Sequence, residues 1–105
     1  MTDLSYFMDA KGLRQPAQDK QGNVILNFGK TIAGQQSTIE LYVKNNLDTA
    51  IYEMSPVSSD PDVVITNHPK LLMPGAVERM EIAFKPGKDR RQKLSDAHWG
   101  FEYAI

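Results

Sequence analysis

The sequence contains no cysteine. A chain without thiols has no disulfides, no thiolate metal ligands and no cysteine nucleophile, so its fold rests on packing and hydrogen bonds. It also lacks an excess of charge, since 12 Lys and Arg stand against 13 Asp and Glu, which gives a net charge of −1. Proteins that bind nucleic acid over a broad surface usually carry a clear basic excess, and we therefore expect no nucleic-acid partner.

Long apolar runs are missing as well. No stretch approaches the ~20 apolar residues that a membrane-spanning helix requires. Residues 1–9 lack the basic start and the continuous apolar segment of about 7 to 15 residues that mark a secretory signal. We expect a protein made in the cytoplasm without a signal peptide and without a membrane partner, which reaches a virion if an assembly carries it there.

Short strand patterns separated by turn residues fill the chain from residue 24 onward. Residues 38–43 alternate most strictly, with Ile39, Leu41 and Val43 expected to point inward. Gly29 and Gly34 are expected to bracket a turn, and Pro56 is expected to end a strand. The other predicted strands cover residues 24–29, 50–54, 63–66, 77–84 and 99–105. About six to seven strands without a helix predict an all-β, antiparallel β-sandwich.

Residues 1–23 read as an extended N-terminal arm, ahead of a sandwich that covers residues 24–105. The arm begins with an apolar cluster of Leu4, Tyr6, Phe7 and Met8 and continues with polar, unperiodic sequence. Chain ends concentrate disorder unless something ties them down. Because Leu4, Tyr6 and Met8 alternate like a strand, the arm has two further fates: it folds back onto its own sheet, or it adds to the sheet of a neighbouring subunit.

Residues 85–93 are expected to form a charged loop. The segment holds Lys85, Lys88, Arg90, Arg91 and Lys93 against the single acidic residue Asp89. Such a cluster is either a solvated connection or a surface that docks onto an acidic protein or a phosphate. Together with the apolar cluster of the arm, these cations are our candidate partner-binding residues.

No residue pattern points to catalysis. His68 and His98 are the only histidines, and their spacing does not place two imidazoles on one element. Ser58, Ser59 and Ser95 lack the setting of an activated nucleophile, and the carboxylates are scattered. We expect no catalytic residues, no metal and no cofactor.

Two ligand sites are weaker alternatives. Asp60 and Asp62, with Asn67, are more typical of a hydrogen-bonded turn than of a calcium loop, which requires a denser set of oxygen ligands. Trp99, Phe101 and Tyr103 alternate on the last predicted strand. They are more typical of core residues than of a carbohydrate platform, since Gly100 and Ala104 on the other face bury little.

Three motifs occur in order along the chain: Phe28-Gly29 after an apolar strand, Asn45-Asn46 at the end of the strand that follows Gly34, and Pro74-Gly75 before Phe84-Lys85-Pro86. With these motifs the chain resembles the immunoglobulin-like domains of the ASH (ASPM, SPD, Hydin), major sperm protein and PapD-like families. The resemblance covers about residues 23 to 105 and implies a non-enzymatic module that binds proteins or builds assemblies. Such domains usually have two more strands after the last motif, whereas here one is predicted, so we expect an open sheet edge.

These observations lead to a structural interaction protein as the first hypothesis. It would be a small accessory subunit, of the kind that decorates or cements phage and viral shells, attached through its arm and its open edge to other protein subunits or to itself. The second hypothesis is an ASH-type adaptor domain that binds a cellular protein as a monomer. A third is a sandwich that binds carbohydrate or an ion.

Overall fold

The computed structural model describes residues 3–18, 20, 24–88, 90–93 and 99–105. In these ranges the chain is all-β and contains eight strands. They are β1 (Leu4–Phe7), β2 (Asn27–Thr31), β3 (Ser37–Asn45), β4 (Tyr52–Ser58), β5 (Val63–Asn67), β6 (Val77–Phe84), β7 (Arg90–Lys93) and β8 (Trp99–Ala104). None of the described segments is a helix long and apolar enough to cross a bilayer.

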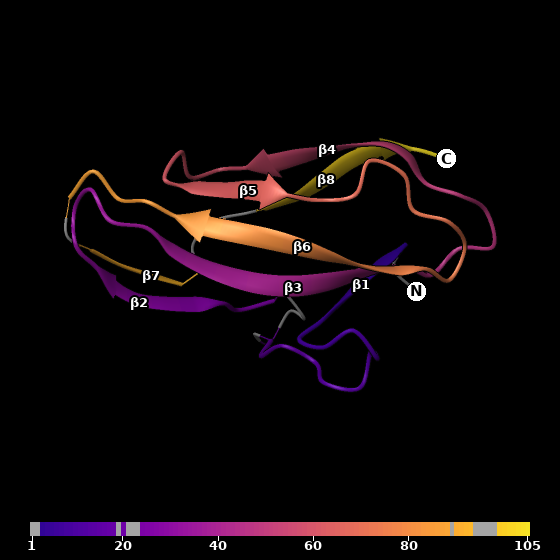
Figure 1. The fold of residues 1–105 in the computed structure, drawn as a ribbon, viewed down its shortest axis with the longest axis horizontal. Coiled ribbons are helices and arrows are strands. Elements are labelled where there is room, and N and C mark those ends of the chain that lie inside the picture. Colours follow the sequence, from indigo (N-terminus) through magenta and orange to yellow (C-terminus); the bar gives the residue numbers. More distant parts are fainter. Residues whose placement is uncertain (1–2, 19, 21–23, 89, 94–98) are drawn as a thin grey trace.

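The strands form two layers (Figure 1). One layer is a four-stranded sheet in the order β1-β3-β6-β5, and the other consists of two separate pairs, β2-β7 and β4-β8. Every pairing is antiparallel. The predicted all-β antiparallel sandwich is therefore confirmed.

The core lies between the layers and centres on β3 and β6. Leu41 pairs with Met80 in register, and both side chains are 0% exposed. Val43 is equally buried, and Ile39 is partly buried against the same cluster, so the predicted inward face of β3 is confirmed. Successive strand residues point to opposite faces, which accounts for the exposure of Thr38 and Glu40.

Asn45 ends β3 and joins three segments. Its side chain is 0% exposed. Its Nδ2 donates to the carbonyl oxygens of Thr49 (2.8 Å) and Leu72 (2.9 Å), and its Oδ1 accepts from the Leu47 amide at 2.8 Å. A buried amide must be satisfied in this way, and the predicted Asn turn thus also holds the loop before β6.

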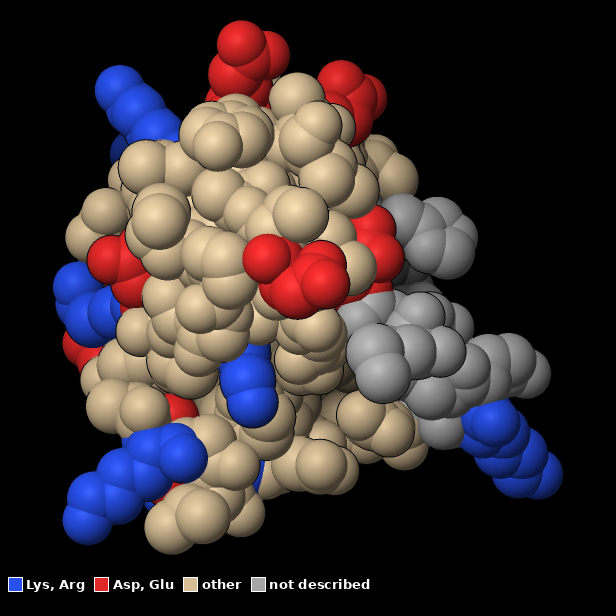
Figure 2. Space-filling view, turned by 90° about the vertical axis from the view of Figure 1, so that its right-hand side faces the viewer, with Lys and Arg blue, Asp and Glu red and all other residues tan. Residues whose placement is uncertain are grey.

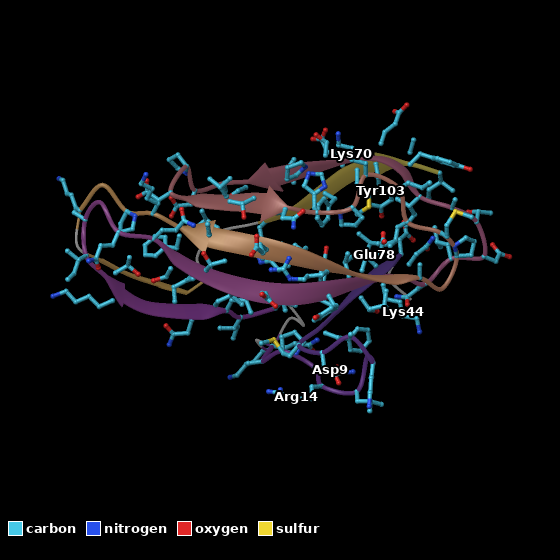
Figure 3. All side chains as sticks on the ribbon, viewed as in Figure 1. Asp9, Arg14, Lys44, Lys70, Glu78 and Tyr103 are labelled. Carbon is cyan, nitrogen blue, oxygen red and sulfur yellow. The ribbon has the colours of Figure 1, made fainter. Side chains whose placement is uncertain are left out.

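The arm folds back onto its own sheet. β1 pairs with β3 from Leu4↔Asn45 to Phe7↔Tyr42. After β1, Asp9 Oδ1 accepts hydrogen bonds from the amides of Leu13 (2.9 Å) and Arg14 (3.0 Å), and Figure 3 shows Asp9 and Arg14 in this loop. These backbone hydrogen bonds, with the Arg14 charge, lower the pKa of Asp9. Of the three fates considered for the arm, the structure shows the intramolecular one for β1.

Two predicted strand ends are wrong. Gly29 does not open a turn, because its φ of 69° forms an irregularity in the β2-β7 register and the strand continues to Thr31. The turn comes later, where the Gln35 amide donates to the Ile32 carbonyl. Pro56 does not end β4, which continues to Ser58. An edge strand tolerates proline where the missing N–H would have faced solvent.

The predicted loop over residues 85–93 is also partly wrong. Residues 90–93 form β7, which pairs with β2 through Lys30↔Arg91 and Thr31↔Arg90. The charged residues gave no apolar alternation from which a strand could be predicted. Only the stretch around Lys85 and Lys88, between β6 and β7, is a loop.

Candidate protein-interaction edge

β8 carries an aromatic face toward the core. Trp99, Phe101 and Tyr103 are partly buried and pack against the central cluster, whereas Glu102 and Ala104 are exposed. Their interpretation as core residues is therefore confirmed. The outward positions of β8 are small or charged, so its outer face offers no aromatic platform.

The backbone direction of β8 follows from its partner β4. Ile51 and Leu72 exchange both backbone hydrogen bonds at 2.9 Å, and the Met54 amide donates to the Lys70 carbonyl at 3.1 Å. Ile51 and Met54 therefore direct their backbone groups toward residues 70–72. Ile51 and Met54 face the same side although they are three residues apart, because β4 is irregular between Tyr52 and Ser55, where Glu53 has a φ of 55°. On each side of this irregularity the directions alternate, so the β4 residues that face β8 are those opposite Ala104, Glu102 and Gly100.

The intervening residues of β8 form an open edge. By the same alternation, the N–H and C=O groups of Trp99, Phe101 and Tyr103 point away from β4. No other strand of the described ranges pairs with this side of β8. We call this side the β8 edge. An unpaired edge is a template for another strand. The sequence led us to expect an open edge because one strand was predicted after Phe84-Lys85-Pro86; two strands follow, but β7 pairs with β2 and leaves β8 with one neighbour.

Two contacts, one from Tyr6 of β1 and one from Asp3 just before it, hold β8 in place across the sandwich. The rings of Tyr6 and Trp99 pack edge to face with centroids 4.8 Å apart. The Tyr103 hydroxyl donates to Asp3 Oδ2 at 2.7 Å, and Figure 3 shows Tyr103 near the strand ends. Burial and the nearby Tyr103 raise the pKa of Tyr6, and burial with the Asp3 hydrogen bond raises the pKa of Tyr103. Contacts at Trp99 and at Tyr103 thus fix both ends of β8 in the absence of a partner.

Apolar side chains gather beside the end of β8. Tyr52 is 50% exposed, Leu71 45% and Met73 55%. The inward bridge between Ile51 and Leu72 places Tyr52 and Leu71 side by side on the outer face. Figure 2 views this end of the sandwich, where residues other than Lys, Arg, Asp and Glu cover most of the surface and both acidic and basic side chains project from it. We call Tyr52, Leu71 and Met73 the apolar end.

The candidate residues from the sequence lie in two separate places. Leu4, Tyr6 and Met8 pack against the core, and Phe7 is half-buried beside them. Lys85 and Lys88 are exposed near the opposite end, where Arg90, Arg91 and Lys93 belong to β7. Figure 1 shows β1 and β7 at different ends of the molecule, so the arm and the cations do not form one surface.

The remaining candidate ligand residues form local contacts. Asp60 Oδ1 accepts from the Asp62 amide at 2.9 Å, as the predicted turn requires. His68 lies beside Phe101 with ring centroids 5.5 Å apart, and its Nδ1 is 2.8 Å from the Pro69 carbonyl oxygen. His98 and Ser95 lie outside the described residues. Among the residues that are described, no group of three or more metal-ligating side chains comes together.

Sequence reasoning missed the side of β5 that faces away from β6. β5 is the last strand of the four-stranded sheet, and Val64 on it is 50% exposed. The run Val63-Val64-Ile65 contained the signal. Val64 is an apolar residue at the outward position of an alternating strand, and no other residue of the same strand covers it.

Comparisons with protein-family models, with curated proteins and with solved structures found no match for this chain. The resemblance to ASH, major sperm protein and PapD-like domains therefore stays a prediction from the motifs.

Proposed function

We propose that this chain is a non-enzymatic interaction protein whose β8 edge accepts an extended segment of a partner protein as an additional strand. The observation that carries the proposal is the outward direction of the backbone groups of Trp99, Phe101 and Tyr103. A strand added there would form main-chain hydrogen bonds, which give affinity in this mode of recognition. It would also cover aromatic side chains that are only partly buried.

Glu102 defines the chemistry of the partner strand. It is the charged outward residue of β8 and is exposed. Opposite charges on neighbouring strands stabilise a sheet by about 0.2 to 1 kcal/mol, and like charges directly opposite destabilise it. A second copy of β8 centred on Glu102 would bring two carboxylates together. The preferred partner is therefore a different sequence with apolar inward residues and a Lys or Arg near Glu102.

We also propose that the sandwich has an immunoglobulin-like topology. Constant-type immunoglobulin domains have one sheet with the strand order A-B-E-D and a second sheet that includes a C-F pair. The order β1-β3-β6-β5 and the pair β4-β8 fit this scheme if β2 and β7 are additional strands, β2 between A and B and β7 between E and F. In that scheme the position beside β8 belongs to strand G, which supports strand addition at this edge.

Within this class we propose an accessory subunit of a larger protein assembly, of the decoration or cement type found in phage and viral particles. The support is the small sandwich with an open β8 edge and the apolar end beside it. The assembly role follows by analogy of fold and size with such subunits. The adaptor is the alternative, and a protein that stays monomeric while it binds a partner strand would favour it.

Strand capture can be tested with two short capped peptides, one alternating valine with lysine and the other alternating valine with glutamate. Trp99 is the only tryptophan and lies in β8, so its fluorescence reports occupation of the edge. We expect the lysine peptide to bind more tightly at low salt. Glu102→Lys, which changes an exposed side chain, should reverse the preference.

A third peptide serves as the matched control. It has the lysine sequence with N-methyl groups at alternate backbone amides, so it keeps its side chains but loses donors for a strand ladder. We expect it not to bind. Equal binding of the methylated peptide, or no binding of either unmethylated peptide, would contradict strand addition at β8.

A further inference from the structure

β5 provides a second open edge. It is the last strand of the four-stranded sheet, at the side of that sheet opposite β1. A groove of about 190 Å³ runs between β5 and the second half of β4. It is lined mainly by apolar residues, namely Pro56, Val57, Pro61, Val63, Val64 and Ile65. Val57 is 39% and Val64 50% exposed. This groove is separate from the β8 edge.

The backbone direction of β5 follows from its start. The Lys85 amide donates to the Asp62 carbonyl at 2.9 Å, so Asp62 directs its carbonyl toward the β6 side. By alternation Val64, which pairs with Ala83, does the same, and Val63 and Ile65 direct theirs away from β6. The Val63 amide donates to Asp60 within the turn at 3.0 Å. The Val63 carbonyl and both backbone groups of Ile65 therefore line the open side of β5.

We propose that a second copy of this chain binds here, with the two β5 strands antiparallel about a two-fold axis at Val64. The Ile65 amide of each copy would donate to the Val63 carbonyl of the other. The two Val64 side chains would face each other across a non-hydrogen-bonded pair, where strands bring side chains closest. The regular part of β5 ends after Ile65, where its register with β6 shifts, and this favours an axis at Val64.

The distribution of charge is the argument for a second copy. Asp60 and Asp62 precede β5, whereas Lys70 follows it. A two-fold interface must be complementary to itself, because the same patch supplies both sides. In the antiparallel arrangement each acidic turn lies toward the Lys70 end of the other copy. The β8 edge lacks this property, since Glu102 would meet its own copy.

The contact is short, because β5 has five residues. We therefore expect a weak dimer that forms as the protein concentration rises, with apolar contact between the two grooves added to the backbone pairing. The four-stranded sheets of the two copies would become continuous across the axis. The inference stands apart from strand capture at β8 and does not depend on it.

A single cysteine tests the axis directly, since the chain has none of its own. Val64→Cys replaces an exposed side chain at the proposed axis. Residues in such a pair have Cα atoms about 4.5 Å apart, which lies within the range that a disulfide bridges. Thr38→Cys is the matched control, because Thr38 is exposed and both it and Val64 pair with Ala83 of β6. Under mild oxidation we expect covalent dimers of Val64→Cys and not of Thr38→Cys. Equal yields from both variants, or no dimer from Val64→Cys, would overturn the proposal.

A charge series measured by sedimentation velocity tests the complementarity. Lys70→Glu changes an exposed side chain and should weaken dimerisation by repulsion from the acidic turn. Adding Asp60→Asn should recover part of the loss, because asparagine keeps the Oδ1 that accepts from Asp62 while it removes a charge. Lysine-peptide binding at β8 should stay unchanged in both variants. A wild-type chain that remains monomeric at all concentrations, or dimerisation that ignores Lys70→Glu, would exclude the second copy.

Discussion

The two layers of the sandwich use similar strands but differ in continuity. In the four-stranded sheet, β3 and β6 have neighbours on both sides, and Leu41, Val43, Met80 and Ile82 are all 0% exposed. In the divided layer, β8 has one neighbour, and its larger aromatic residues are only partly buried. The central strands thus bury their inward side chains completely, whereas β8 leaves larger ones partly exposed. The divided layer therefore contains the edge at which we propose strand addition, the open side of β8.

Removal of β1 should cause the largest loss of stability. Deletion of residues 1–10 takes away the strand that pairs with β3 and the Tyr6 ring that packs on Trp99. We expect a lower midpoint in urea unfolding with no loss of subunits, because β1 folds back within one chain. Light scattering and urea titration of the two chains check this. Unchanged stability, or an oligomer that dissociates on truncation, would contradict the intramolecular pairing.

Alanine substitutions in the two layers should differ in the same direction as burial. Leu41→Ala is expected to cost ~2 to 5 kcal/mol, because it opens a cavity among fully buried residues. Phe101→Ala removes more atoms, but its partly buried ring should cost less than Leu41→Ala. Urea unfolding of both variants gives the comparison. A larger loss for Phe101→Ala would mean that β8 is covered as well as β3 in solution.

Alkaline pH should have the smallest effect on stability. This effect arises from Tyr6, whose ring packs against Trp99 between the two layers. The pKa of Tyr6 is raised above its ordinary value of 10.0 mainly by burial. The unfolded chain therefore loses this proton at a lower pH than the folded chain, and stability should be constant below about pH 10 and fall above it. Tyr6→Phe should flatten this fall, which urea midpoints measured from pH 8 to 11 can show. Parallel slopes for both proteins would mean that Tyr6 is exposed to solvent.

The sequence was sufficient to predict the strands and turns that the side chains of the segment itself determine. The alternation of Ile39, Leu41 and Val43 predicted β3, and the Pro74-Gly75 pair predicted the turn before β6. β7 could not be predicted, because residues 90–93 are charged or polar and become a strand only through pairing with β2. Pro56 and Gly29 gave misleading stop signals, since an edge strand and a bulge accommodate them.

The candidate site was predictable only in outline. The sequence predicted one strand after Phe84-Lys85-Pro86, and this was wrong, because β7 and β8 both follow. β8 still has an open edge because β7 pairs with β2, and the side of β8 that is open depends on which of its backbone groups face β4. That choice is made by the bridge between Ile51 and Leu72, which joins segments far apart in the sequence. The edge of β5 depends in the same way on the hydrogen bond between Lys85 and Asp62.

Hydrogen exchange of the β8 amides tests the central claim most directly, because the strand contains its own control. We predict rapid exchange for the amides of Trp99, Phe101 and Tyr103, which face the open edge, and slow exchange for those of Gly100, Glu102 and Ala104, which face β4. The amides of β3 should be slow as a reference. Equal protection along β8 would show that its outer side is already paired and would contradict strand capture at this edge.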